Sequence, residues 1–190
     1  MSGTWFWSDL HIDHEFVAGT RGFDSAAEHD AELARRWDKT VRPGDIVWLC
    51  GDLTGRRGSE HNGLAWLAQR PGKIIFVPGN HDACHGMHAD AYKRMPDYLE
   101  VVDAVIERAS RKIAGRRVLL SHFPYDEDHS SFIRYTQWRY PDEGKWLIHG
   151  HTHSTIQQRG RELHVGVDAH PDGPVPLKWI EDRIRDGAHE

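Results

Sequence analysis

The stretch KIIFVPGNHD, residues 73–82, decides the fold because an apolar strand in it runs directly into polar side chains. Its first residues are mostly β-branched or aromatic and a Pro-Gly pair ends the run, which is typical of a buried strand. Asn80, His81 and Asp82 follow at once. In α/β proteins, side chains beyond the carboxyl ends of strands lie at the ligand-binding edge of the sheet. The stretch therefore predicts a strand that delivers polar groups to a site.

The same junction occurs four more times along the chain. The other apolar runs are WFW at 5–7, DIVWLC at 45–50, RVLL at 117–120 and WLI at 146–148. The polar residues that follow them are Asp9 and His11, Asp52, His122, and His151 with His153. Because strand ends of one domain can meet at a common edge, we expect these side chains to converge. One such junction would carry little weight, but five in order predict a site.

Helical patterns separate the early strands. Ser25 and Glu28 have the spacing of a capping box ahead of AAEHDAELARRWDKTV, residues 26–41. A second helix is expected over EHNGLAWLAQR, residues 60–70. The alternation of strands and helices predicts an α/β fold with a central sheet. No linker or repeat divides the sequence, so we expect residues 1–190 to form one domain.

Composition limits the partners and the location. The 190 residues are 38% hydrophobic and 28% charged, and the net charge of −5 offers no basic surface for long nucleic acid. No apolar run approaches the roughly 20 residues of a membrane span, and the N-terminal stretch does not read as a signal peptide. Two cysteines are too few for a disulfide framework. We therefore expect a cytoplasmic protein with a small-molecule partner and no membrane contact.

The converging side chains are carboxylates, an amide and imidazoles, with no cysteine among them. Such mixed oxygen and nitrogen donors suit Mn, Fe, Zn or Ni better than Ca²⁺ or a zinc held by thiolates. The set exceeds the coordination sphere of one ion. We therefore expect two divalent ions per chain, with Mn favoured, about 3.5–4 Å apart and able to clamp a phosphoryl group.

In order, the motifs Asp-x-His, Gly-Asp, Gly-Asn-His-Asp, a lone His and Gly-His-x-His resemble those of the calcineurin-like metallophosphoesterase family, in its small, single-domain bacterial or phage form. The resemblance implies a two-sheet β-sandwich flanked by helices in four αββα layers, with a dinuclear centre at one edge. It also implies a ligand partition of Asp9, His11 and His153 for one ion, Asn80, His122 and His151 for the other, and Asp52 as the bridge. His149 is outside the motif and is expected to be a strand residue.

The resemblance further implies catalytic roles for His81 and Asp82. In this hypothesis a metal-bridging hydroxide attacks phosphorus in line, and no phosphoenzyme forms. His81 faces the substrate, stabilises charge on the phosphoryl oxygens and protonates the leaving group, while Asp82 orients His81. The competing interpretation of the pair is a turn-capping element.

Two residues near the first motif are candidates for substrate binding. His14 could reach the metal edge or a phosphate oxygen, although Asp13 stands where small relatives commonly carry Gly. Arg21 could bind phosphate through its fork of donors. The alternative for both is an ordinary surface side chain.

Aromatic residues and arginines interleave in FPYDEDHSSFIRYTQWRY, residues 123–140. Aromatic faces and guanidinium groups can stack a nucleobase. The candidates in this stretch are Tyr125, Arg134, Trp138 and Arg139. The alternative is a hairpin whose aromatics pack on the sheet.

Two other histidine-containing stretches are interpreted as structural. CHGMH at 84–88 could suggest a further metal, but a polar loop before a helix explains it. HVGVDAH at 164–170 predicts a last strand near the site, with Asp168 and His170 in structural roles.

The leading functional hypothesis is a metal-dependent phosphodiesterase that acts on small diesters such as 2′,3′-cyclic nucleotides. The intervals from Asp82 to His122 and from His122 to His149 are too short for a cap domain, which predicts an open cleft able to admit a diester. The alternatives are a phosphomonoesterase or phosphoprotein phosphatase, a non-catalytic binding scaffold and a DNA nuclease. The complete motif set argues against the scaffold, and the acidic charge argues against the nuclease.

Overall fold

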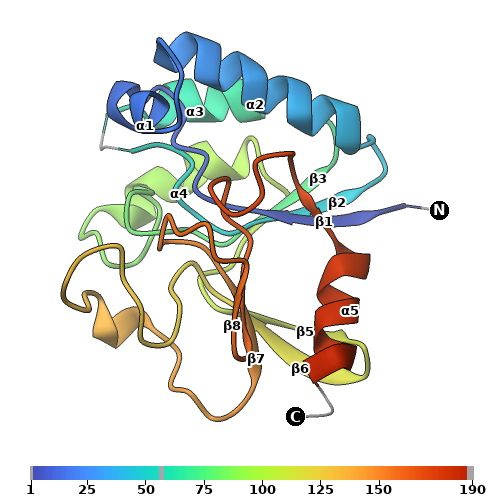
Figure 1. The fold of residues 1–190 in the computed structure, drawn as a ribbon. Helices are drawn as coiled ribbons and strands as arrows, with labels where there is room; N and C mark the ends of the chain where they lie inside the picture. The colour runs from blue at the N-terminus through green and yellow to red at the C-terminus, as the bar shows by residue number, and fades with distance from the viewer. Residues whose placement is uncertain (1, 56–57, 188–190) are drawn as a thin grey trace.

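The apolar runs of the first half of the chain form the middle of a five-stranded sheet (Figure 1). The computed structural model describes residues 2–55 and 58–187. In the order β10-β1-β2-β3-β4, strands β1 to β4 are parallel and β10 is antiparallel to β1. The bounds are β1 Thr4–Trp7, β2 Ile46–Leu49, β3 Lys73–Phe76, β4 Ala104–Val105 and β10 Val175–Pro176. The three strands predicted for this region are β1, β2 and β3.

A second five-stranded sheet has the order β5-β6-β7-β9-β8. Strands β6, β7 and β9 are parallel, and the outer strands β5 and β8 are antiparallel to their neighbours. The bounds are β5 Ala109–Ile113, β6 Arg116–Leu120, β7 Trp146–His149, β8 Gln158–Arg159 and β9 Glu162–His164. The predicted strands at 117–120 and 146–148 are β6 and β7. The predicted last strand lies earlier than expected, because β9 ends at His164.

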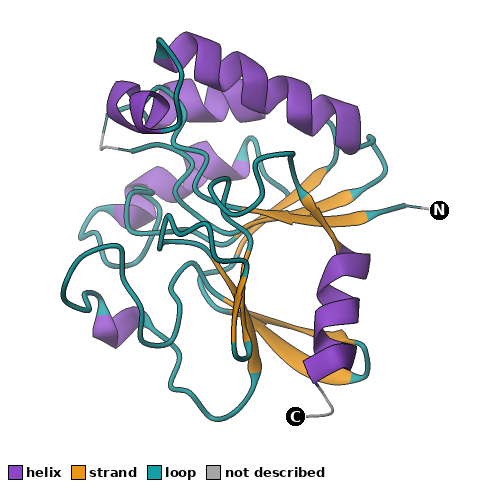
Figure 2. Cartoon of the chain, viewed as in Figure 1, coloured by secondary structure: helices purple, strands orange, loops and turns teal. Residues whose placement is uncertain are grey.

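Helices α2 Ala26–Thr40, α3 Glu60–Leu67 and α4 Ala91–Leu99 pack on the outer face of the first sheet (Figure 2). Helix α5 Leu177–Asp186 packs in the cluster of the second sheet. The remaining helices are α1 Glu15–Thr20 and the short 3-10 helix η1 Thr136–Trp138. Ser25 caps α2 by accepting the Glu28 N–H at 3.2 Å, as its spacing predicts. No helix within the described ranges is long and apolar enough to cross a membrane. The observed fold is therefore the predicted α/β two-sheet sandwich flanked by helices.

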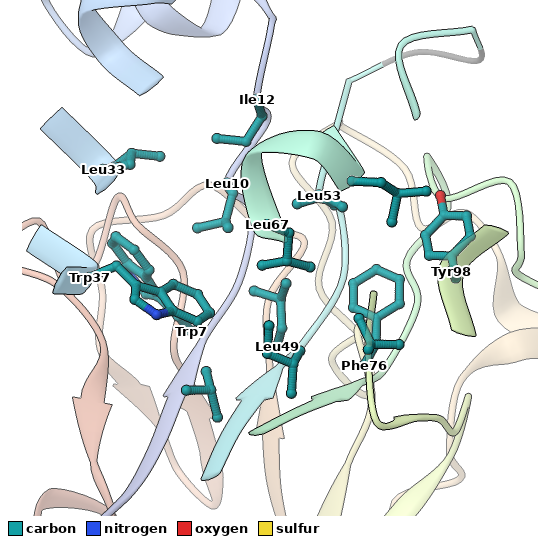
Figure 3. Close-up of a cluster of buried hydrophobic side chains, with 14 of the residues drawn as sticks. Trp7, Leu10, Ile12, Leu33, Trp37, Leu49, Leu53, Leu67, Phe76 and Tyr98 are labelled. Atoms are coloured by element: carbon teal, nitrogen blue, oxygen red, sulfur yellow. The ribbon is translucent and has the colours of Figure 1, made fainter. Parts of the chain in front are cut away.

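Two apolar clusters hold these layers together. Trp7, Leu49 and Phe76 of the first sheet pack against Trp37 and other residues of the helices, in the cluster of Figure 3. Phe6 points to the opposite face, where it packs with the second sheet and with α5. Successive side chains of a strand alternate between faces. A strand between two buried clusters must therefore be apolar at every position, as WFW is.

The register of the strands brings their carboxyl ends to one place. Trp7, Leu49 and Phe76 are partners or neighbours in register across β1, β2 and β3. The two sheets are joined beyond these ends, because the Val167 N–H donates to the Ser8 carbonyl at 3.1 Å. The polar junctions of both sheets consequently share one edge.

Candidate metal centre

The backbone at this edge turns sharply at several of the predicted ligands. Non-glycine residues with positive φ include Asp9 at 59°, His11 at 50°, Asp52 at 53°, His151 at 74° and His153 at 52°. A left-handed conformation costs an ordinary residue roughly 1–2 kcal/mol, and such strain concentrates at functional sites. Its repeated occurrence here follows from turning three chain segments, those after β1, β2 and β7, inward immediately after their strands.

The first subsite consists of Asp9, His11 and His153, whose ligating atoms lie within 4.8 Å of one another. Nε2 of His11 is 3.1 Å from Nε2 of His153. Two imidazole nitrogens at that separation can share a cation, since ligand atoms about 2.1 Å from a metal lie roughly 3.0–3.4 Å apart. The grouping is the one that the resemblance implies.

The second subsite consists of Asp52, His122 and His151. Nε2 of His122 lies 3.2 Å from Nδ1 of His151 and 3.4 Å from Oδ2 of Asp52. The same Asp52 oxygen is 3.8 Å from Nε2 of His11 in the first subsite. One carboxylate oxygen therefore faces both subsites, as a bridging ligand would.

Asn80 directly precedes His81, whose backbone N–H donates to Oδ1 of Asp52, and its own side chain has an unused acceptor. The residue is buried, and Oδ1 has no hydrogen-bond partner among the described residues. A buried amide oxygen without a partner is costly, and a cation would satisfy it. The donors at this edge are carboxylate, amide and imidazole, which fits Mn, Fe, Zn or Ni.

Three of the subsite histidines have their outer nitrogen held by a hydrogen bond. His122 Nδ1 donates to the Cys50 carbonyl at 2.9 Å. His151 Nε2 donates to Asp128 at 3.1 Å, and His153 Nδ1 donates to Asp168 at 3.0 Å. Such bonds fix the tautomer and leave the other ring nitrogen free to bind metal. Asp128 is not among the residues predicted from the sequence, because no motif marks it.

Electrostatics at the second subsite favour cation binding. Burial lowers the pKa of His151 to about 3 and so keeps its ring neutral near pH 7. Burial also opposes protonation of His122, but the adjacent Asp52 carboxylate raises the pKa of His122 to about 9. The same contact lowers the pKa of Asp52, although burial acts in the opposite direction. The proton between them occupies the place that a cation can take.

His81 and Asp82 do not form the pair that the sequence predicts. The His81 side chain is 38% exposed, with Nε2 4.0 Å from Oδ2 of Asp52. The buried Asp82 carboxylate instead accepts the N–H groups of Asp52, Leu53 and Gly79 at 2.8, 3.0 and 2.7 Å. In the described chain its hydrogen bonds hold the loops after β2 and β3. The prediction that Asp82 orients the His81 ring is therefore wrong.

Arg21 is not a substrate-binding residue, contrary to the prediction. Its side chain is 7% exposed, and its guanidinium donates to Asp168 and to the backbone carbonyls of Asp9 and Leu10. His14 caps α1 through Nδ1, which accepts a backbone N–H, and its ring lies edge-on to that of His11 at 5.7 Å. His14 thus borders the first subsite, and its contact with substrate stays a prediction.

The predicted stacking residues of 123–140 are mostly used within their own loop. Arg139 is 6% exposed and donates to three backbone carbonyls of the loop, and the Tyr125 hydroxyl donates to the Lys145 carbonyl. Arg134 donates to Asp128, and Trp138 packs edge-on to His85 at 5.0 Å. The substrate-binding role predicted for Arg139 is therefore wrong, because its guanidinium is buried and already has partners. The Tyr125 ring is half-buried, and the roles predicted for Tyr125, Arg134 and Trp138 stay predictions.

The histidines interpreted as structural do have structural surroundings. His149 is the buried last residue of β7 and stacks on His164 at 5.3 Å. His85 packs against aromatic rings, and His88 donates to the Asn80 carbonyl at 3.1 Å. His170 donates to the His164 carbonyl at 3.0 Å.

Glycine is required where the chain passes closest to the second subsite. A Cβ at Gly79 would lie 2.3 Å from Oδ1 of Asp52 and 2.8 Å from the His122 ring. Gly79→Ala should therefore displace both side chains, lower the metal content and destabilise the protein by about 1–3 kcal/mol. Gly44→Ala is the control, because a Cβ there meets open space. Metal analysis and thermal unfolding check this, and unchanged metal content in Gly79→Ala would contradict it.

Two ligand groups that face one carboxylate at the strand ends of an α/β sandwich are typical of two-metal enzymes, a class that includes the hydrolases of phosphoric esters. The sequence pattern of the calcineurin-like phosphoesterase superfamily domain matches residues 5–167. The chain belongs to this superfamily and is a metal-dependent phosphoesterase. The expected family is thereby confirmed.

Relatives cover nearly the whole chain. The Gene 66 protein of Mycobacterium phage L5 is 44% identical over 182 residues, which are 89% of this chain and 88% of the phage protein. The Gene 66 protein of Mycobacterium phage D29 is 41% identical and covers 98% of both chains. A solved structure of a protein of unknown function from Aquifex aeolicus aligns with a TM-score of 0.72 over 96% of this chain and 99% of that one. At 23% identity, this likeness shows the fold alone.

Proposed function

We propose that the protein is a phosphodiesterase that uses two divalent ions, with Mn²⁺ favoured, to hydrolyse small phosphodiesters. The observation that carries the proposal is the position of Asp52, whose Oδ2 lies 3.4 Å from His122 of the second subsite and 3.8 Å from His11 of the first. A carboxylate in that position supports two neighbouring ions rather than one. Bound there, the ions supply positive charge to the phosphoryl oxygens and an acidified water as nucleophile.

The side chains around the subsites supply the remaining chemistry. His81 is the partly exposed imidazole beside Asp52, and its backbone N–H donates to Oδ1 of Asp52 at 3.1 Å. This bond anchors the residue while leaving the ring free to meet a phosphoryl oxygen or a leaving group. Asp82 preserves the geometry by holding the loop backbones. We propose that His81 donates a proton to the departing oxygen.

The exposure of the site supports a diester substrate. The side chains of His81, His153 and His129 are 38%, 29% and 39% exposed, whereas those of His122 and His151 are 0% and 1% exposed. The ligating face is thus open to solvent on one side. An open face has few side chains that could select the dianionic terminal phosphate of a monoester. It also leaves room for the second ester group of a diester.

A 2′,3′-cyclic nucleotide is the natural substrate that we favour. The half-buried Tyr135 ring lies 5.9 Å from that of His151, and the Arg134 guanidinium lies 5.2 Å from the Tyr135 ring. An aromatic face beside the metal edge can support a base by stacking. Tyr135 therefore replaces Trp138 as the leading candidate for this contact.

Bis-nitrophenyl phosphate and nitrophenyl phosphate test the proposed reaction. With Mn²⁺ present, we expect a higher kcat/KM for the diester. The open face has few groups that would recognise the second negative charge of a phosphomonoester. The assay is a matched colorimetric titration of both substrates, extended to cyclic nucleotides. A monoester preference of tenfold or more, about 1.4 kcal/mol in transition-state free energy, would contradict the proposal and favour a phosphatase.

A further inference from the structure

We propose, resting on the dinuclear function above, that Asp168 and Asp128 are positioning residues, one for each metal subsite. Each is a carboxylate of low exposure that accepts the outer N–H of one ligating histidine and is held in place by arginine. Asp168 serves His153 of the first subsite, and Asp128 serves His151 of the second. Their common task is to aim the inner nitrogen of each ring at the metal position.

Asp168 is held by a two-pronged ion pair. Arg21 Nε and Nη2 donate to its Oδ1 and Oδ2 at 2.9 and 2.8 Å, and Oδ2 also accepts His153 Nδ1 at 3.0 Å. With the Nδ1 proton directed outward, the lone pair of His153 Nε2 points toward His11, 3.1 Å away. The exposed fractions of the Arg21 and Asp168 side chains are only 7% and 18%.

Arg21 links the Asp168 carboxylate to the loop after β1, which carries Asp9 and His11. Its Nη2 donates to the Asp9 carbonyl at 2.8 Å and its Nη1 to the Leu10 carbonyl at 3.3 Å. His29 of α2 contacts Nη1 at 3.0 Å and so supports the guanidinium from the helix side. One buried cation thereby fixes the loop that carries Asp9 relative to the carboxylate that orients His153.

Asp128 makes equivalent contacts at the second subsite, where its carboxylate accepts hydrogen bonds from a ligand histidine and from two arginines. Its side chain is 1% exposed, and Oδ2 accepts His151 Nε2 at 3.1 Å and Arg139 Nη2 at 3.0 Å. Oδ1 accepts Arg134 Nη2 at 2.7 Å. Two arginines and one histidine thus donate to this one buried carboxylate.

The two assemblies have no residue in common, although the subsites they support touch where the His151 N–H donates to Asp9 at 3.0 Å. Arg21 directly follows α1, and Asp168 lies in the segment after β9. Asp128 and Arg139 both lie in the loop between β6 and β7. Loss of one outer carboxylate should therefore weaken one subsite and spare the other. Partners of this kind typically contribute 10–100-fold to metal affinity.

Variants that keep only one tight metal subsite allow the effect of each carboxylate on Mn²⁺ affinity to be measured separately. His122→Ala should leave the first subsite as the tight one, and His153→Ala should leave the second. In metal-free protein titrated with Mn²⁺ by calorimetry, we expect Asp168→Asn to weaken binding about 10–100-fold in the His122→Ala background only. Asp128→Asn should do so in the His153→Ala background only. Asp172→Asn, an exposed aspartate in the same segment, is the matched control.

The titrations distinguish failure of the proposed dinuclear function from failure of the positioning roles of Asp168 and Asp128. Fewer than two Mn²⁺ ions in the wild-type protein would overturn the proposed dinuclear function. Two ions in the wild type, with Mn²⁺ affinity unchanged in both backgrounds or reduced equally in both, would overturn the positioning roles. Thermal unfolding of the metal-free variants monitors folding. If Asp168→Asn does not fold, Arg21→Lys replaces it, because lysine keeps the positive charge but cannot donate two parallel hydrogen bonds to Asp168. Arg21→Lys should weaken Mn²⁺ binding at the first subsite alone. Weaker binding at the second subsite would contradict the positioning role of Asp168.

Discussion

Asp52→Asn is expected to weaken both metal ions together and to remove nearly all activity. The amide can keep Oδ1 as the acceptor for the His81 N–H, a bond of 3.1 Å, but it presents an NH₂ group where Oδ2 faces both subsites. Loss of one electrostatic group at a reacting centre already costs about 10²–10³ in turnover, so we expect a fall of roughly 10³-fold or more. Metal analysis of the purified variant, alongside steady-state kinetics with added Mn²⁺, measures both effects.

Asp45→Asn is the matched control for loss of a buried aspartate. Asp45 is 5% exposed and accepts hydrogen bonds from Trp5 and Arg42 at the other end of β2. Its replacement should lower the thermal stability without changing the number of bound ions. If Asp52→Asn retains two ions at wild-type affinity, Asp52 is not the bridge. If it loses one ion only, the carboxylate belongs to a single subsite.

The ligand groups could be predicted from the sequence because each junction is a local pattern. An apolar run such as KIIF, rich in β-branched and aromatic residues, favours a strand, and the polar residues that follow it then emerge at its carboxyl end. Parallel pairing of β1, β2 and β3 then gathers these residues without any further information. Elements with weaker patterns were missed. Strands β4 and β8 are two residues long, and β5 carries exposed polar side chains on one face.

The outer partners of the ligands were not predictable by the same reasoning. Arg21 and Asp168 are 147 positions apart, and only the path of the segment beyond β9 brings them together. Asp128 lies in a long loop whose course depends on the buried Arg139 and its bonds to backbone carbonyls. Aromatic and arginine residues in such a loop resemble a binding surface in the sequence. The structure shows that several of them hold the loop itself.

His81→Ala should reduce turnover while leaving the metal content nearly unchanged. The ring is 38% exposed, and Nε2 stands 4.0 Å from Asp52, so the ring borders the subsites without completing either group. A general acid contributes about 10²–10⁴-fold, and we expect a loss in that range for a substrate with an alkoxide leaving group. His61→Ala, which removes an exposed histidine of α3, should have wild-type kinetics. Metal loss in His81→Ala would place this residue among the ligands instead.

The leaving group separates the two roles that His81 can have. Nitrophenolate departs without protonation, so a proton donor contributes little to hydrolysis of bis-nitrophenyl phosphate. The alkoxide leaving group of a 2′,3′-cyclic nucleotide is far more basic and needs the proton in the transition state. His81→Ala should therefore slow the cyclic nucleotide much more than the nitrophenyl diester. Equal losses would mean that the imidazole acts through its charge on the phosphoryl oxygens, because that charge develops with either leaving group.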